Sequence, residues 1–324
     1  MTEFTLSTLT SERRKAISEE LISELYIDLR CKVNKWAMLT KQTSQARMGY
    51  VGQHLVSIVT GLEGSRTGAR GDDLVYPDGK RHSEVKTCYR VDQLGECSDC
   101  GFKVAASDTQ CPSCGSSNLK RKDDSKWLIS LPANPKLAHE KFISLFSNES
   151  FYLVLFEFED TNNPDVIRAL IWEVDPKYKG FSYCMLDYYT NIWTKSQSHA
   201  PFNLWPYLPK FYLMNPKLIY HARILQNNRV DTVKFPGIDD AEKCCFPKLT
   251  NFARSTGFTL KVCQRLASAF KIDARGLTKQ QLLATIEKYR NDVQMSNDLL
   301  LEELNMAFYA DVKRKLNKLP KNCR

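Results

Sequence analysis

Two acids and a lysine around a predicted β-hairpin are the residues best suited to chemistry in this chain. Positions 71–75 read GDDLV and positions 83–87 read SEVKT, with a Pro-Asp-Gly turn between them. Because side chains two apart on a strand share a face, Glu84 and Lys86 point one way and Val85 the other. The hairpin brings the acid of the first strand, Asp72 or Asp73, to the same place. Two carboxylates and an ammonium there suit a divalent metal and a phosphate under attack, which indicates cleavage of nucleic acid.

A second group with clear chemistry consists of two CxxC motifs separated by ten residues. Its members are Cys97, Cys100, Cys111 and Cys114. Four thiolates at this spacing can hold one zinc ion tetrahedrally, and the glycine after each motif permits the tight turn that such a knuckle needs. We therefore predict a zinc ribbon inserted at about 92–125.

The sequence allows two interpretations of the role of the ribbon. An insertion too short to bury a core folds on its metal, which makes it a structural staple. Lys120 and Arg121 follow the second motif, which makes contact with nucleic acid an equally natural role.

The elements that position these groups follow from apolar spacing. Helical periodicity dominates residues 1–60, with a helix at 50–60 that glycines close. Apolar strand patterns come at 127–131, 151–157 and 169–174. Residues 201–225 are dense in proline and aromatic residues and are predicted to be irregular, and a boundary is predicted near 235–237. From 246 onward the pattern is helical.

A glycine-rich loop at 60–71 leads from the helix to the hairpin. It carries Arg66 and Arg70, so it can bring guanidinium groups and backbone amides close to phosphate. Together with Arg47, these arginines are candidates for contact with DNA.

The C-terminal helices have a layout of two helices joined by an extension at 271–276. Thr278 is placed to cap the second helix. The layout resembles SAP-like DNA-binding modules over about 35 residues, which makes Lys279 a candidate for contact with the phosphate backbone. A plain helical hairpin used for packing or dimerisation fits the same pattern.

Composition sets broad limits on the class of protein. The chain has 324 residues and a formal net charge of +9, which favours a polyanionic partner. No run approaches the ~20 apolar residues of a membrane span. The N-terminus lacks the basic and apolar regions of a signal peptide, so we expect a cytoplasmic protein with reduced cysteines and no membrane partner.

The acid-lysine hairpin resembles the PD-(D/E)xK nuclease superfamily. The resemblance implies an α+β fold, a mixed sheet flanked by helices, to which this chain adds the zinc ribbon and the helical C-terminal region. It implies Asp73, which suits the strand register better than Asp72, and Glu84 as ligands of magnesium, with Lys86 positioning or activating water. In many members a helix before the hairpin places a Glu or Gln beside the metal. Gln53 is the candidate for that position here, with His54 as the alternative.

A narrower resemblance is to the MamI-type restriction endonucleases. It is carried over about residues 35–130 by QARMGYVGQH at 45–54, TGARG at 67–71, the hairpin and the inserted ribbon. It implies Type II cleavage of a short double-stranded DNA site, with a companion DNA methyltransferase that protects the host. Since both strands must be cut, a homodimer with two active sites is expected.

The predicted organisation is a nuclease domain at 1–235, the ribbon within it, and a helical region at 246–324. A repair or mobile-element nuclease of the same fold remains an alternative. A non-catalytic zinc-ribbon DNA-binding protein is a second one, although it would leave the hairpin without a purpose.

Overall fold

The computed structural model describes residues 5–40, 49–65, 73–105, 108–122, 124–160 and 164–313. The chain forms two compact units, each made of three segments that alternate along the sequence. Unit 1 comprises residues 1–127, 149–173 and 217–242, and unit 2 comprises 128–148, 174–216 and 243–324. The domain boundaries given above stay predictions.

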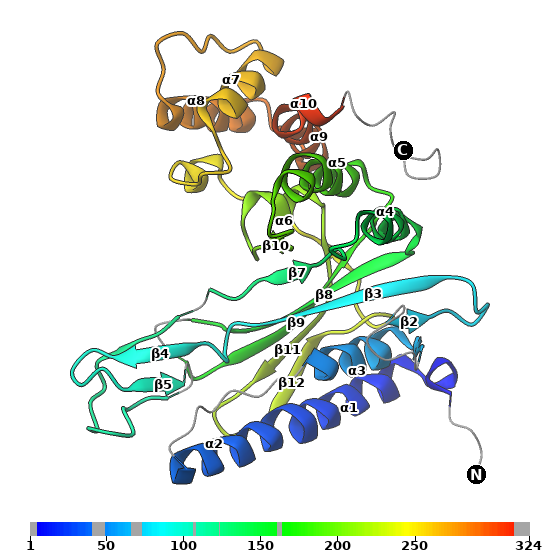
Figure 1. Cartoon of the computed structure of the whole chain (residues 1–324), viewed down its shortest axis with the longest axis vertical. Helices are drawn as coiled ribbons and strands as arrows, with labels where there is room; N and C mark the ends of the chain where they lie inside the picture. Colours follow the sequence, from blue (N-terminus) through cyan, green and yellow to red (C-terminus); the bar gives the residue numbers. More distant parts are fainter. Residues whose placement is uncertain are drawn as a thin grey trace. The chain divides into compact units, whose positions relative to one another are not determined.

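Unit 1 is built on a mixed sheet with the strand order β1-β2-β3-β8-β9-β11-β12, and β13 pairs with β11 (Figure 1). Its strands are β1 (Glu63–Gly64), β2 (Leu74–Val75), β3 (His82–Tyr89), β8 (Ser150–Phe158), β9 (Ile167–Val174), β11 (Lys217–Ile224), β12 (Val230–Lys234) and β13 (Glu242–Lys243). β3 and β8 run parallel, whereas β2 with β3 and β9 with β11 are antiparallel. The expected α+β class with a mixed sheet is confirmed.

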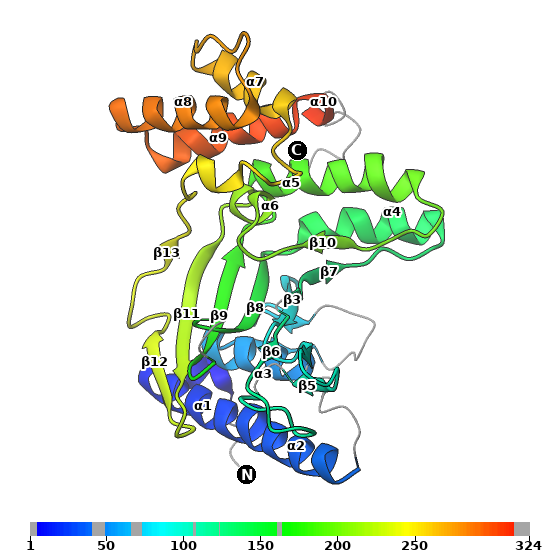
Figure 2. The same ribbon diagram turned by 90° about the vertical axis from the view of Figure 1, so that its left-hand side faces the viewer.

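The helices of unit 1 lie along one face of this sheet, as Figures 1 and 2 show. They are η1 (Leu6–Thr8), α1 (Ser11–Leu21), η2 (Ile22–Asp28), α2 (Leu29–Thr40) and α3 (Gly49–Thr60). Ile22 and Tyr26 from η2, and Leu55 and Val56 from α3, join one buried cluster with Val85 of β3. Val85 therefore faces the helices, as the strand alternation predicts.

β8 is apolar over nearly its whole length because it is buried on both faces. All nine of its residues are buried, which is the pattern of a central strand with a parallel neighbour. The Trp127 indole N–H donates to the Val154 carbonyl at 2.8 Å and fixes the chain leaving the ribbon against this strand.

The ribbon region between β3 and β8 forms its own small sheet of β5 (Lys103–Ala105), β4 (Leu94–Cys97) and β6 (Leu119–Lys120). Cys97, Val104 and Cys111 make its buried cluster, with Phe102 and Leu119 packed against it. So few apolar side chains cannot stabilise a fold alone, which is the expected situation for a metal-dependent insertion.

Unit 2 is mainly helical. Its elements are β7 (Trp127–Ile129, whose first residue belongs to unit 1), α4 (Pro135–Ser144), η3 (Leu145–Ser147), α5 (Lys179–Asp187), η4 (Tyr188–Ile192), η5 (Trp193–Lys195), β10 (Phe202–Leu204), α6 (Pro209–Leu213), η6 (Leu249–Phe252), α7 (Leu260–Ala269), α8 (Lys279–Asp292), α9 (Asn297–Phe308) and α10 (Ala310–Lys313). Thr278 caps α8 in a full capping box with Gln281, as predicted.

One prediction about the chain's organisation is wrong. Residues 201–225 are not irregular, because they contain β10, α6 and the eight-residue strand β11. Tyr220, Ala222 and Ile224 alternate into the core that faces the helices, and this period-two pattern was masked by the preceding prolines and aromatic residues.

Among the described residues, no helix has the length and apolar character that crossing a membrane requires.

Candidate active site and metal centre

The hairpin of β2 and β3 brings the predicted acids and lysine together at one edge of β3. Leu74 pairs with Ser83 and Val75 with His82. Continuing this register by one residue places Asp73 opposite Glu84. The turn between the strands is held by Asp78, whose carboxylate accepts from the backbone N–H groups of Lys80 and Arg81. Donation from those two amides, and from the Arg81 side chain, lowers the pKa of Asp78 to about 2, so this acid belongs to the turn.

Asp73 is positioned by two different elements. Its Oδ1 accepts from the side-chain amide of Gln53 on α3 at 2.6 Å. Its Oδ2 accepts from the backbone N–H of Val85 at 2.7 Å. Val85 lies between Glu84 and Lys86 in the chain. The bond from its N–H therefore holds the Asp73 carboxylate against the segment of β3 that carries both side chains. The structure thus brings all four predicted catalytic residues to one place.

Glu84 and Lys86 form an ion pair on β3. Glu84 is only 6% exposed, whereas about a quarter of the Lys86 side chain reaches solvent. A buried carboxylate is costly unless cations or donors surround it. Two carboxylates and one ammonium leave one net negative charge in this cluster.

The same strand face continues beyond the predicted site. Cys88 is buried, and burial raises the pKa of its thiol to about 11, so it is a packed thiol rather than a nucleophile. Glu157 of β8 pairs with Arg168 of β9 at 2.5 Å and lies 4.0 Å from Arg90. The sequence analysis did not predict this network. Arg90 nevertheless follows Glu84, Lys86 and Cys88 at the two-residue spacing of side chains on one strand face.

Close contact between α3 and β3 explains how Gln53 reaches Asp73. A Cβ atom built on Gly52 would lie 2.0 Å from Thr87 Oγ1 of β3, so only glycine lets the helix approach this strand. The Thr87 hydroxyl also donates to the Gly49 carbonyl at 3.3 Å. Gly52 was not predicted as a site residue, but a glycine inside an otherwise apolar helix is the signal that identifies it.

Replacement of Gly52 by alanine should therefore disturb the site. We expect Gly52→Ala to destabilise the protein by roughly 1–3 kcal/mol, because α3 must move away from Thr87. Gly49→Ala is the matched control, since a Cβ there meets nothing within 4 Å. Chemical denaturation of both variants and of Gly52→Ala/Thr87→Ala measures the effect. Equal stabilities of Gly52→Ala and Gly49→Ala would contradict the close contact. Partial recovery of stability in the double variant would show that the contact is with the Thr87 side chain.

The donors at this cluster fit the magnesium ion that the superfamily resemblance implies. Magnesium prefers oxygen ligands and is commonly held by one or two carboxylates together with water and substrate phosphate. Asp73 and Glu84 supply two carboxylates, and the net negative charge of the cluster calls for a cation. These two residues would hold the metal.

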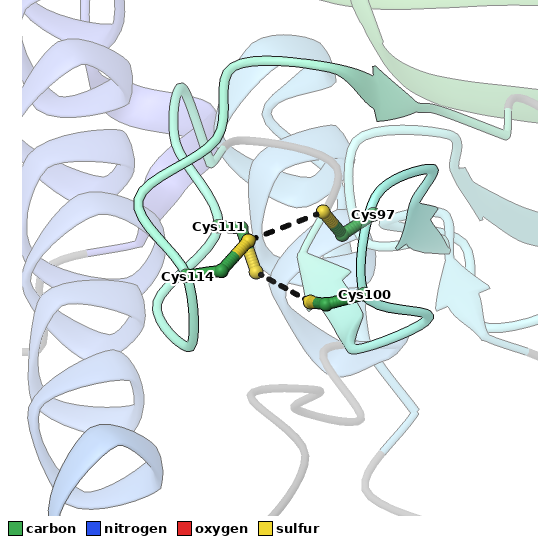
Figure 3. Close-up of side chains that lie close together, drawn as sticks. All are labelled: Cys97, Cys100, Cys111 and Cys114. Atoms are coloured by element: carbon green, nitrogen blue, oxygen red, sulfur yellow. Dashed lines mark hydrogen bonds between the residues drawn. The ribbon is translucent and has the colours of Figure 1, made fainter.

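The four predicted cysteines meet in the ribbon (Figure 3). Their sulfur atoms lie within 4.8 Å of one another. Cys97 Sγ is 3.7 Å from Cys114 Sγ, and Cys100 Sγ is 3.6 Å from Cys111 Sγ. A tetrahedral zinc site with Zn–S bonds of ~2.3 Å has sulfur–sulfur edges of ~3.8 Å, whereas a disulfide needs ~2.05 Å. The cluster therefore has the dimensions of a zinc site.

Both knuckles have the same backbone geometry. Gly101 N–H donates to the Cys97 carbonyl at 2.9 Å, and Gly115 N–H donates to that of Cys111 at 2.8 Å. Both glycines have positive φ angles, 74° and 76°, which a side chain would strain. The glycine roles predicted from the sequence are confirmed.

The base of the ribbon is anchored by an ion pair that was not predicted. Arg30 Nε of α2 lies 3.2 Å from Asp92 Oδ1, in the link between β3 and β4. Burial raises the pKa of Asp92, and the positive charge of Arg30 opposes that rise. Nothing in the local sequence pairs these two residues, because they come from elements about sixty positions apart.

The predicted DNA-contact residues divide into three groups. Lys120 is exposed on β6. Arg121 donates to the Asp108 carbonyl at 2.9 Å, and Lys279 donates to the Ser255 carbonyl at 3.1 Å, so both make contacts within their own unit. Arg47, Arg66 and Arg70 lie outside the described residues, as does Asp72.

Comparison with known proteins settles the family. The sequence profile of the MamI restriction endonuclease matches residues 35–250, more than half of the chain and including the hairpin, the ribbon and the central strands. The chain belongs to the MamI restriction endonuclease family.

A named MamI family member is similar over part of its length. The Type II restriction enzyme MamI of Microbacterium ammoniaphilum is 37% identical over 86 residues, which are 26% of this chain and 26% of that enzyme. The chain thus matches about a quarter of the length of this relative. No solved structure gives a significant match.

Proposed function

We propose that this protein is a Type II restriction endonuclease that makes magnesium-dependent double-strand cuts at a short DNA site. The observation that carries the proposal is the joint placement of Asp73, Glu84 and Lys86, with Gln53 bonded to Asp73. Membership of the MamI family supports DNA as the substrate. A small acidic cluster with one ammonium is suited to hydrolysis of a phosphodiester.

Each residue of the cluster has a task that its contacts suggest. Gln53 and the Val85 amide orient the Asp73 carboxylate, and Glu84 holds the Lys86 ammonium in place. Lys86 positions the attacking water and stabilises the negative charge that develops on the phosphate. The water oxygen forms a bond to phosphorus and the bond from phosphorus to one sugar oxygen breaks. The attacking water gives up a proton to solvent, and the leaving sugar oxygen takes up a proton from solvent. Magnesium, when bound, supplies Lewis-acid stabilisation of that charge and lowers the pKa of the water.

The wider proposal concerns assembly and partners. Because a Type II enzyme cuts both strands of one site, two copies of the cluster are needed, and a homodimer supplies them. A companion DNA methyltransferase would protect the host's own sites. The Cys97, Cys100, Cys111 and Cys114 cluster would hold zinc as a structural ion, and Lys120 at its edge is the ribbon's exposed candidate for contact with phosphate.

Digestion of unmethylated plasmid and phage DNA tests this proposal. With magnesium we expect discrete fragments, and sequencing of their ends should show one short shared motif. Chelation of the divalent metal should stop cleavage. The checks are gel electrophoresis and end sequencing after equal incubation times.

Other outcomes identify the alternatives. Cleavage restricted to damaged, branched or mobile-element DNA would favour a repair or transposition nuclease. Tight binding without cleavage in any divalent metal would contradict the enzyme proposal and favour a zinc-ribbon DNA-binding protein.

A further inference from the structure

The long helix formed by α1, η2 and α2 carries a row of large apolar side chains on its outer side. Leu25, Leu29, Trp36 and Leu39 are 40%, 38%, 58% and 71% exposed. The opposite side of the same helix packs on the sheet, since Ile22, Tyr26 and Ile27 are buried there. Large apolar side chains are commonly exposed singly, but four on one helix face form a patch that marks an interaction site.

The spacing of this row is that of a coiled-coil seam. The positions 25, 29, 32, 36 and 39 follow steps of four, three, four and three residues, the a/d repeat of heptads. The hydrogen bonding changes to π-helical over Ile22–Asp28. The seam positions nevertheless all stay exposed across this change. The exposed residues of the segment include 24, 25, 28, 29, 31, 32, 35, 36 and 39. We call positions 25, 29, 32, 36 and 39 the outer seam.

We infer that the outer seam is a dimerisation surface, on which the same helix of a second copy packs antiparallel. In that arrangement Leu25 of one copy faces Trp36 of the other, and Leu29 faces Lys32. The two-fold axis repeats each layer, so positions 25, 29, 32 and 36 cover one another in four layers, and Leu39 lies at the end of the seam. Lys32 is the one charged member, and a single polar residue in a seam fixes register and orientation at a cost in stability.

Charge complementarity supports a second copy as the partner. Asp28 and Lys35 flank the seam at equivalent heptad positions, on its N-terminal and C-terminal halves. Both are exposed, and the Lys35 ammonium lies 5.8 Å from the centre of the Trp36 ring. In the antiparallel pair, Asp28 of each copy meets Lys35 of the other, so both flanking contacts join opposite charges.

This inference deepens the homodimer of the proposed function, but its test needs neither DNA nor metal addition. The experiment is sedimentation velocity of the full chain over a wide concentration range. We expect a concentration-dependent dimer for the parent. We expect a monomer for Leu29→Lys, which sets the added ammonium group against Lys32 of the other copy in two layers of the seam. Cleavage can be absent while the dimer persists, and the dimer can be absent while cleavage persists. Each of the two proposals can therefore be contradicted without the other.

A charge swap gives the sharper result. Asp28→Lys and Lys35→Asp each replace two attractive contacts by two repulsive ones, so each should weaken the dimer by about tenfold. The double variant should restore the affinity to within roughly threefold of the parent, since the contacts return with their signs exchanged. The two positions are seven apart on one helix, too far for an intrahelical pair.

Controls separate the interface from folding. Arg13→Asp changes an exposed charge at the start of α1, away from the seam, and should leave the dimer intact. Circular dichroism and thermal unfolding check that Leu29→Lys stays folded. A parent that is monomeric throughout, a dimer that survives Leu29→Lys, or a double variant no tighter than the single ones would each overturn the inference.

Discussion

Lys86→Ala should lower the rate of DNA cleavage by roughly 10²–10⁴-fold while leaving DNA binding nearly unchanged. The lysine forms an ion pair with Glu84 on β3, and the Asp73 carboxylate accepts from the backbone N–H of Val85 between them. Its loss removes positive charge from the place where charge develops on the phosphate. Single-turnover cleavage in magnesium, with binding measured in calcium, separates the two effects.

Lys80→Ala is the matched control for this variant. Lys80 belongs to the same hairpin, but it lies exposed in the turn rather than beside the acids. Both variants remove one positive charge, so a general electrostatic effect on DNA would lower both rates alike. Equal rates for Lys86→Ala and the parent would remove Lys86 from the proposed mechanism.

Cys97→Ser should abolish stoichiometric zinc binding and open the ribbon. We expect about one zinc per chain in the parent, because four sulfur atoms lie at tetrahedral distances. Metal binding to such sites supplies on the order of 10 kcal/mol of folding free energy, and the ribbon has few buried apolar residues to replace it. Metal analysis and limited proteolysis between 97 and 122 measure the two consequences.

Cys245→Ser provides the comparison for the cysteine variant. Cys245 is exposed and lies outside the cluster, so its replacement should change neither zinc content nor protease sensitivity. Full zinc content and unchanged stability in Cys97→Ser would show that the four-cysteine site is wrong.

The local parts of the site were predictable from the sequence because they depend on local rules. Strand alternation correctly set Val85 toward the helices and put Glu84 and Lys86 together. The two CxxC motifs and their glycines predicted the sulfur cluster, since knuckle geometry is fixed within four residues. The N-cap of α8 at Thr278 was predictable for the same reason, because capping also depends on a few neighbouring residues.

The contacts between distant segments were harder to predict. The resemblance named Gln53, but only the close approach of Gly52 to Thr87 explains how α3 brings it to Asp73. The parallel pairing of β3 with β8 joins strands separated by the whole ribbon and α4. No short-range pattern encodes that pairing, because it depends on which buried surfaces fit together.

The aromatic segment shows how composition can mislead. Positions 181–212 are dense in aromatic residues, a composition that suits either stacking on bases or packing in a core. In the structure Phe181, Tyr188, Trp193 and Phe211 are almost fully buried, so these rings pack within unit 2. Bulky aromatic residues fill a core as readily as they stack on bases, and periodicity alone does not separate the two uses.

The most direct test of the active-site assignment compares Glu84→Gln with the parent on one DNA substrate in magnesium. Glu63→Gln serves as the control, since Glu63 is an exposed acid on β1 of the same sheet. We expect identical sharp fragments from the parent and Glu63→Gln, and intact DNA with Glu84→Gln at equal binding. Cleavage by Glu84→Gln at the parental rate would contradict the assignment of the active site to this hairpin.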